Sequence, residues 1–321
     1  MSRKVLIPLD GSNFSEHALP LGLDLARRLG AEVHLVRVHE PLAPLTYAGE
    51  VPIFDPGWEH ELRTREEEYL RGWVDVVGER AGLRAHGALL DGTAVDALAS
   101  YMQEVEVDLV VMTTHGRGGL SRFWLGSVAD GLVRRATAPL LLLRPEEEQV
   151  DLDRVPSLSR ILVPLDGTGF SRQVLDRVVV LARTLGADLT LLRVVVPVFT
   201  LGVPLPPASA AEVPPALERE RSFAAEYLES VAEEVGDRSL EVRTAVVVHQ
   251  QPAEGIVEYA ESHDVDLIAM ATHGRGGLAR LTLGSVADKV LRSSRTPLLL
   301  YRPSGERAAS AGATPPARSE G

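Results

Sequence analysis

The sequence predicts an α/β protein of two consecutive domains, each with a five-stranded parallel sheet flanked by helices. Two observations lead to this prediction. Short apolar runs alternate with helix-length segments along the 321 residues, which is typical of parallel strands joined by helical crossovers. In addition, the block at 114–130 returns nearly unchanged at 272–288, so that Gly116 corresponds to Gly274. A repeat at this distance, in a chain of this length, indicates a tandem duplication.

Ten apolar runs are expected to form the strands. They are continuous rather than alternating, as in strands that are buried on both faces of a sheet. They lie at 5–9, 32–38, 85–90, 108–113 and 139–143 in the first half, and at 161–165, 188–195, 241–248, 266–271 and 297–301 in the second. We expect the spatial order 3-2-1-4-5 in each sheet.

Turn and capping residues follow each first strand, as Asp10-Gly11-Ser12 and Asp166-Gly167-Thr168. The first helix is predicted over 15–29, closing at Gly30, and its second-half partner closes at Gly186. Pro20 should cost the first helix some regularity. The other predicted helices lie at 59–78, 95–104 and from 127 onward, and at 216–235, 253–262 and from 285 onward.

The predicted boundaries place one domain at 1–146, a linker at 147–157, the second domain at 158–304 and a disordered tail at 305–321. The tail is small, polar and rich in proline, a composition that cannot bury a core. Long proline-rich connectors occupy 39–58 and 197–215. Within the second connector, the apolar stretch 196–207 is expected either to cover a pocket or to pack between the domains.

Composition excludes several classes of function. The net charge of −12 argues against binding to nucleic acid, because phosphate recognition usually requires a basic face. The absence of cysteine excludes disulfides and thiolate chemistry. The beginning of the chain reads as a strand rather than a signal peptide, and no apolar run approaches the length that crosses a bilayer. We therefore expect a cytoplasmic protein without a membrane partner.

The repeated glycine-rich loop predicts an anion-binding site. Gly116, Gly118 and Gly119 follow the fourth strand and let the backbone approach a ligand closely. Gly126-Ser127 then opens a helix whose first N–H groups lack partners and suit a phosphate. Arg117 and its equivalent Arg275 would add positive charge. Ser127 and Ser285 would add a hydroxyl, and both are also candidate N-cap residues.

The carboxyl ends of the first and fourth strands should face each other, because ligands of open parallel sheets bind where the strand order reverses. Asp10 and Asp166 would then accept hydrogen bonds from a base or ribose, or serve only as caps. His115 and His273 are expected to pack or to make loop hydrogen bonds. No residue is assigned as catalytic, since no P-loop lysine, nucleophile elbow or triad is found. No metal-ligand spacing is found either.

The loop and helix start resemble the nucleotide-binding motif of the universal stress protein family in its tandem form, G-x2-G-x9-G-(S/T). Gly116 and Gly126-Ser127 match its later part, as do Gly274 and Gly284-Ser285, whereas Thr113 and Ala271 replace its first glycine. The resemblance implies a Rossmann-like, adenine nucleotide α-hydrolase-like fold that binds ATP with a Mg or Mn ion. It also implies that the last strands of the two domains pair as a pseudo-dimer within the chain, and it leaves a homodimer open.

The motif and the resemblance together predict the residues that contact the adenine nucleotide. They are Asp10, Val38, Thr114, His115, Gly116, Arg117, Gly119, Gly126, Ser127 and Val128 in the first half, and Asp166, Val194, Thr272, His273, Gly274, Arg275, Gly277, Gly284, Ser285 and Val286 in the second.

The expected function is nucleotide-dependent conformational or partner signalling in a stress response, with little or no turnover. Two alternatives stay open: a nucleotide hydrolase or transferase of the α-hydrolase superfamily, and an interaction module that binds no nucleotide. The halves are expected to differ, because the second has Ala271 and has Gln250-Gln251-Pro252 in place of Gly92-Thr93-Ala94.

Overall fold

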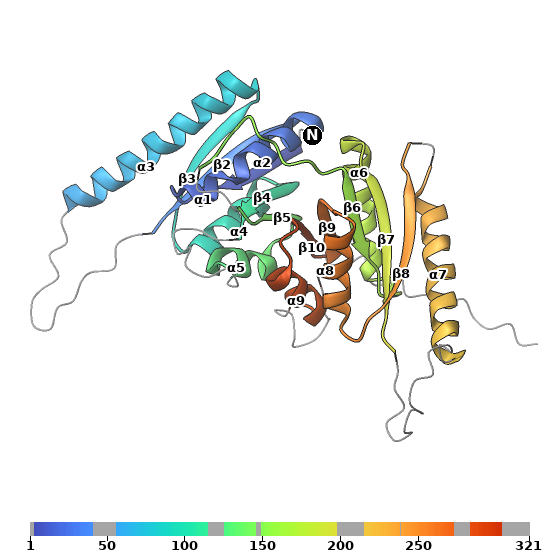
Figure 1. The fold of residues 1–321 in the computed structure, drawn as a ribbon. Helices are drawn as coiled ribbons and strands as arrows, with labels where there is room; N and C mark the ends of the chain where they lie inside the picture. The colour runs from blue at the N-terminus through green and yellow to red at the C-terminus, as the bar shows by residue number, and fades with distance from the viewer. Residues whose placement is uncertain are drawn as a thin grey trace, which may run out of the picture. The chain divides into compact units, whose positions relative to one another are not determined.

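The computed structural model describes residues 3–40, 56–114, 125–145, 149–197, 215–237, 239–272 and 283–303 (Figure 1). The chain divides into two compact units, Met1–Pro156 (unit 1) and Ser157–Gly321 (unit 2). The predicted tail at 305–321 lies outside the described residues, as does most of both proline-rich connectors.

Unit 1 contains a parallel sheet in the predicted order. Its strands run in the order β3-β2-β1-β4-β5. Every pair among them is parallel; in β1, for example, Val5 faces Val33 on one side and Leu109 on the other. The strands are β1 (Arg3–Pro8), β2 (Ala31–His39), β3 (Ala85–Asp91), β4 (Leu109–Thr113) and β5 (Leu140–Leu143).

Helices connect these strands. They are α1 (Asn13–Glu16), α2 (Ala18–Leu29), α3 (Pro56–Val76), a short π-helix η1 (Val77–Ala81), α4 (Ala94–Glu104) and α5 (Ser127–Arg135). Helix α2 packs on β1 and β4, α3 packs on β2 and β3, and α4 packs against α5. The helices cover the apolar strands and so explain why the strand sequences do not alternate.

The first helix is not continuous as predicted. It breaks at His17 into α1 and α2. The break places Pro20 in the first turn of α2, where a missing N–H costs no hydrogen bond. The structure therefore confirms that this proline disturbs the helix, and it locates the disturbance one turn earlier in the chain.

Unit 2 repeats the arrangement in the order β8-β7-β6-β9-β10, again with parallel pairs. Its strands are β6 (Arg160–Pro164), β7 (Asp188–Val195), β8 (Val242–Val248), β9 (Leu267–Ala271) and β10 (Leu298–Tyr301). Its helices are a 3-10 helix η2 (Ser171–Val174), α6 (Leu175–Leu185), α7 (Pro215–Val235), α8 (Pro252–Ser262) and α9 (Ser285–Ser293). Helix α7 packs on β7 and β8, and α8 packs against α9.

The central strands form the core of each unit. Leu6 and Ile7 of β1 are fully buried, and so are Ile161 and Leu162 of β6. Burying side chains of this size stabilises the fold by roughly 1.5–3 kcal/mol each. The order of the strands reverses between β1 and β4, and between β6 and β9, so the carboxyl ends of these parallel strands leave room for a ligand. Across the described ranges, no helix is long and apolar enough to cross a membrane.

Candidate functional site

A pocket of about 590 Å³ lies in unit 2 at the point where the strand order reverses. Its walls come from the carboxyl ends of β6, β7 and β9, from the first turn of α8 and from the start of α9. This volume is within the range of small-molecule sites. The pocket brings together Asp166, Val194, Gly284, Ser285 and Val286, all of which the sequence analysis assigned to the ligand.

The start of α9 supplies hydrogen-bond donors to this pocket. Gly284 precedes the helix with an extended backbone, at φ −57° and ψ 143°, and its carbonyl accepts from the N–H of Asp288 at 2.9 Å. The N–H groups of the three residues between them have no acceptor within the helix. Such a helix start also carries the positive end of the helix dipole, so it favours a negatively charged group.

The expectation that Ser127 and Ser285 cap their helices was wrong. The N-cap positions belong to Gly126 and Gly284, and among the residues that the structure describes no side chain caps either helix start. Each serine is the first helical residue and is exposed. The glycines leave the helix N–H groups without the local hydroxyl partner that a capping serine provides.

Asp166 closes the turn that follows β6. Its Oδ1 accepts from the backbone N–H of Thr168 at 2.9 Å and from the Thr168 hydroxyl at 2.6 Å. Gly167, between them, has φ +81°, a conformation that favours glycine. Burial opposes ionisation of the Asp166 carboxyl, but hydrogen bonds from Thr168 and Ser171 and the charge of Arg193 outweigh it, so its pKa is lowered.

Unit 1 repeats this turn with Asp10. The Oδ1 of Asp10 accepts from the N–H of Ser12 at 2.9 Å and from its hydroxyl at 2.5 Å. The capping residue of α1 is Ser12, whose hydroxyl accepts from the N–H of Ser15. Neither aspartate is therefore a capping residue: Asp10 holds the capping residue Ser12 in place, and Asp166 holds Thr168, whose hydroxyl accepts from the N–H of Ser171 at 3.3 Å.

The base of the glycine-rich loop of unit 1 is closed by a backbone hydrogen bond. The N–H of Gly126 donates to the carbonyl of Thr114 at 2.6 Å. Thr114 is buried and its own N–H donates to Leu143 at 2.8 Å, while Thr272 makes the equivalent bond to Tyr301 at 2.8 Å. These threonine N–H groups are thus engaged by the sheet. Two further predicted site residues of unit 1 are described: Val38 lies next to the buried last residue of β2, and Val128 lies in the first turn of α5.

Eight predicted loop residues lie outside the described part of the chain. They are His115, Gly116, Arg117, Gly119, His273, Gly274, Arg275 and Gly277.

Comparison with known proteins identifies the family. The model of the universal stress protein family matches residues 1–144 and again residues 158–302. The chain belongs to the universal stress protein family. It carries two such domains in tandem, as its repeat indicated.

Relatives of this universal stress protein have the same tandem length. Universal stress protein Rv2005c of Mycobacterium tuberculosis is 30% identical over 305 residues, covering 94% of this chain and 97% of that protein. A universal stress protein of Mycolicibacterium smegmatis is 26% identical over 300 residues, with 93% and 97% covered. The crystal structure of a universal stress protein from Archaeoglobus fulgidus has the same fold, with a TM-score of 0.68, 20% identity and coverage of 95% and 98%.

Several pocket residues of this universal stress protein escaped the sequence analysis. Arg193 precedes Val194 at the end of β7, and Met270 precedes the small residue at the end of β9. Ile256 lies one turn after Pro252 in α8, and both contribute apolar wall. A charged residue at the end of a buried strand was the available signal for Arg193. The position of α8 over the pocket follows from tertiary packing.

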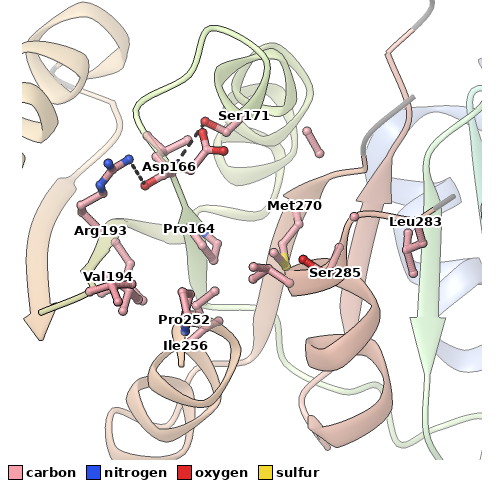
Figure 2. Close-up of a pocket in the computed structure, with 17 residues that line it drawn as sticks. Pro164, Asp166, Ser171, Arg193, Val194, Pro252, Ile256, Met270, Leu283 and Ser285 are labelled. Atoms are coloured by element: carbon pink, nitrogen blue, oxygen red, sulfur yellow. Dashed lines mark hydrogen bonds between the residues drawn. The ribbon is translucent and has the colours of Figure 1, made fainter. Parts of the chain in front are cut away.

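The described residues contain no group of three or more histidine and acidic side chains placed to hold a metal ion. The polar groups that line the pocket include an aspartate, an arginine, two serines and the start of α9 (Figure 2). This set suits a ligand that has both an anionic end and a neutral polar end.

Proposed function

We propose that this universal stress protein binds an adenine nucleotide, most importantly ATP, in the pocket of unit 2 and at the corresponding position of unit 1. We further propose that the bound state signals to partners in a stress response through conformation. The pocket of unit 2 is the observation that carries the proposal, because it combines a helix start suited to phosphate with apolar walls suited to a purine ring.

Different parts of the pocket suit the phosphates and the base of the nucleotide. The N–H groups at the start of α9, which have no acceptor within the helix, would hold the phosphates, with the Ser285 hydroxyl beside them. Val194, Ile256 and Met270 provide apolar contact for the base. In Figure 2, Asp166 and Arg193 lie on one side of the pocket and Ser285 on the other. We assign the equivalent roles in unit 1 to Asp10, Val38, Gly126, Ser127 and Val128 by their repeat positions.

The proposal includes a Mg or Mn ion bound together with ATP. Mg²⁺ is commonly held by one or two carboxylates together with the phosphates of the nucleotide, and it keeps several waters. A full protein cage is therefore not required. The ion would neutralise phosphate charge, which matters in a chain with a net charge of −12.

We also propose that turnover is slow or absent. Phosphoryl transfer needs groups that position a nucleophile and stabilise charge at the transition state. The chain has only two lysines, Lys4 and Lys289, and no P-loop motif. A rate of ATP hydrolysis near about 1 s⁻¹ or above, in the range of ordinary enzymes, would contradict this part and favour the hydrolase alternative.

The first experiment denatures the purified full chain and identifies the released small molecules by mass spectrometry. The second titrates nucleotide-free protein with ATP and Mg²⁺ in a calorimeter. We expect an adenine nucleotide in the first experiment and two binding equivalents per chain in the second. If no nucleotide is released and no heat of binding is detected, the protein is better described as a nucleotide-free interaction module.

A pair of variants tests whether one of the two binding equivalents occupies the pocket of unit 2. Ala271 lies on the pocket wall, so Ala271→Trp should fill the pocket and remove one equivalent. Ala216→Trp makes the same change at an exposed position of α7 in the same unit and should remove none. Equal stoichiometry in both variants would place the ligand elsewhere.

The pairing of the two units through their last strands is also part of the proposal, and it rests on the wholly apolar sequences of residues 140–143 and 298–300. Analytical ultracentrifugation at several concentrations would show whether whole chains associate further.

A further inference from the structure

The two units place an arginine at the same position of the second strand but surround it differently. Arg37 of β2 and Arg193 of β7 each precede the valine assigned to the nucleotide. The following long helices can be matched through Glu68-Tyr69-Leu70 and Glu226-Tyr227-Leu228. One helical turn before the tyrosine, α3 carries Glu66 and α7 carries Ala224, and both positions are buried.

In unit 1 the arginine is paired. Nη2 of Arg37 donates to Oε1 of Glu66 at 2.9 Å, and the two side chains are only 9% and 8% exposed. The guanidinium also lies over the ring of Tyr69, 5.4 Å from its centre. The other oxygen of Glu66 accepts from His39 at 2.7 Å. A buried carboxylate thus neutralises Arg37 and fixes its direction.

In unit 2 neither the glutamate nor the histidine of this cluster is present. Ala224 supplies no carboxylate, and Val195 stands where unit 1 has His39. Arg193 nevertheless lies near Tyr227, as Arg37 lies near Tyr69. Burial raises the pKa of the Tyr227 phenol, and the positive charges of Arg172 and Arg193 oppose that shift. The match between the two long helices therefore holds in the folded units as well as in the sequence.

Arg193 has no glutamate at the Glu66 position, and its side chain lines the pocket. Its Nη1 donates to the carbonyl of Leu165 at 3.3 Å, and the side chain lines the pocket beside Asp166 (Figure 2). The guanidinium lies against Gly167 so closely that a Cβ there would come within 2.8 Å of Nη1. No ion pair of Arg193 is found among the residues that the structure describes. Most of its five donors are therefore available to a ligand.

We propose that Arg193 contacts the bound nucleotide and makes the site of unit 2 the tighter of the two. The inference rests on the proposed function, since it names a residue of that same site. Arg193 adds donors to the ligand beside the Asp166 acceptor, whereas Arg37 of unit 1 is held by its buried ion pair with Glu66. In addition, Glu66 cancels the positive charge of Arg37 in unit 1, so that pair attracts an anionic ligand less than the arginine of unit 2 does.

The test is a calorimetric titration of the full chain with ATP and Mg²⁺. The unchanged protein should show two affinities, and Ala271→Trp should remove the tighter one. Arg193→Gln should weaken the tighter site by about tenfold, the scale of one lost hydrogen bond to a charged group. The matched control is Arg219→Gln, which removes the same charge from an exposed position of α7 and should leave both affinities unchanged.

A second variant recreates the situation of unit 1. Ala224→Glu places a carboxylate at the Glu66 position and should draw Arg193 away from the pocket, which weakens the tighter site as Arg193→Gln does. If Arg193 only held the turn at Leu165, Arg193→Gln would lower the melting temperature of the ligand-free protein, and Ala224→Glu would leave binding unchanged. That pair of results overturns the inference.

The outcomes separate this inference from the function on which it rests. Absence of nucleotide binding by the unchanged protein ends both. Binding at two sites of equal affinity, or binding that Arg193→Gln does not weaken, overturns the role of Arg193 alone and leaves the nucleotide-binding function in place.

Discussion

Replacing Glu66 by alanine tests the buried charge cluster of unit 1. Glu66 accepts from Arg37 at 2.9 Å and from His39 at 2.7 Å, and its side chain is 8% exposed. Removing one partner of a buried ion pair leaves an uncompensated charge and typically costs about 3–5 kcal/mol. Since two charge-assisted bonds are lost here, we expect unit 1 to lose at least about 3 kcal/mol of stability.

Native-state hydrogen exchange is the suitable assay, because two units need not unfold in a single two-state step. Amides of β1 and β2 that exchange only when unit 1 unfolds should exchange about a hundredfold faster in Glu66→Ala. Amides of β6 and β7 in unit 2 should not change. The comparison between the two units serves as an internal control within one sample.

Glu61→Ala is the matched control on the same helix. Glu61 lies 3.6 Å from Arg65 in an exposed pair, with side chains 67% and 72% exposed. Such a pair contributes about 0–1 kcal/mol. If Glu66→Ala costs no more than Glu61→Ala, then Arg37 finds other acceptors once freed, as Arg193 does beside Ala224, and the argument for a costly buried charge in unit 1 is refuted.

Two further predictions concern His39 and Gly255. Burial disfavours the charged form of His39, but hydrogen bonds to Glu66 and Glu59 outweigh this effect and raise the pKa of His39. The stability that protonated His39 contributes should therefore be fully present below about pH 6.5 and be lost as the pH rises through this raised pKa. His39→Gln should therefore flatten the decline in melting temperature of unit 1 above that pH, and an unchanged decline would assign it to other groups. A Cβ on Gly255 would lie 3.3 Å from Cγ1 of Val194, and closer still to a neighbouring histidine, so Gly255→Ala should cost about 1–3 kcal/mol and weaken nucleotide binding in unit 2. Gly72→Ala, which meets no atom within 4 Å in α3, should stabilise the protein slightly; calorimetry and melting curves showing equal effects for both glycines would contradict the close packing of α8.

Much of the fold could be predicted because the signals are local. Strands form at all ten expected places, and the central ones are buried as their apolar runs predicted, whereas β3 and β8 are only partly buried. The glycines after the first long helices end them with a left-handed residue, as Gly30 does at φ +62° and Gly186 at φ +68°. The expected sheet order 3-2-1-4-5 is confirmed in both units.

The candidate site was predictable only where its chemistry lies in consecutive residues. Asp166 and the Gly284-Ser285 helix start carry turn and anion-binding patterns that can be read along the chain. The capping role of the serines was misjudged, because Gly126 and Gly284 take the N-cap position and only backbone geometry distinguishes the two registers. Pocket walls from α8, such as Ile256, depend on how a helix packs over a sheet.

The pair Arg37 and Arg193 shows most clearly what could not be predicted from the sequence. The sequence shows that both arginines hold equivalent positions, and its repeated motif predicts the family resemblance, the two domains and the loop. Which arginine is free to meet a ligand depends on whether a carboxylate reaches it from a helix 29 residues further along the chain. Electrostatic pairing acts through space over a few ångströms, so only the folded units decide that Glu66 neutralises one arginine and Ala224 leaves the other facing the pocket.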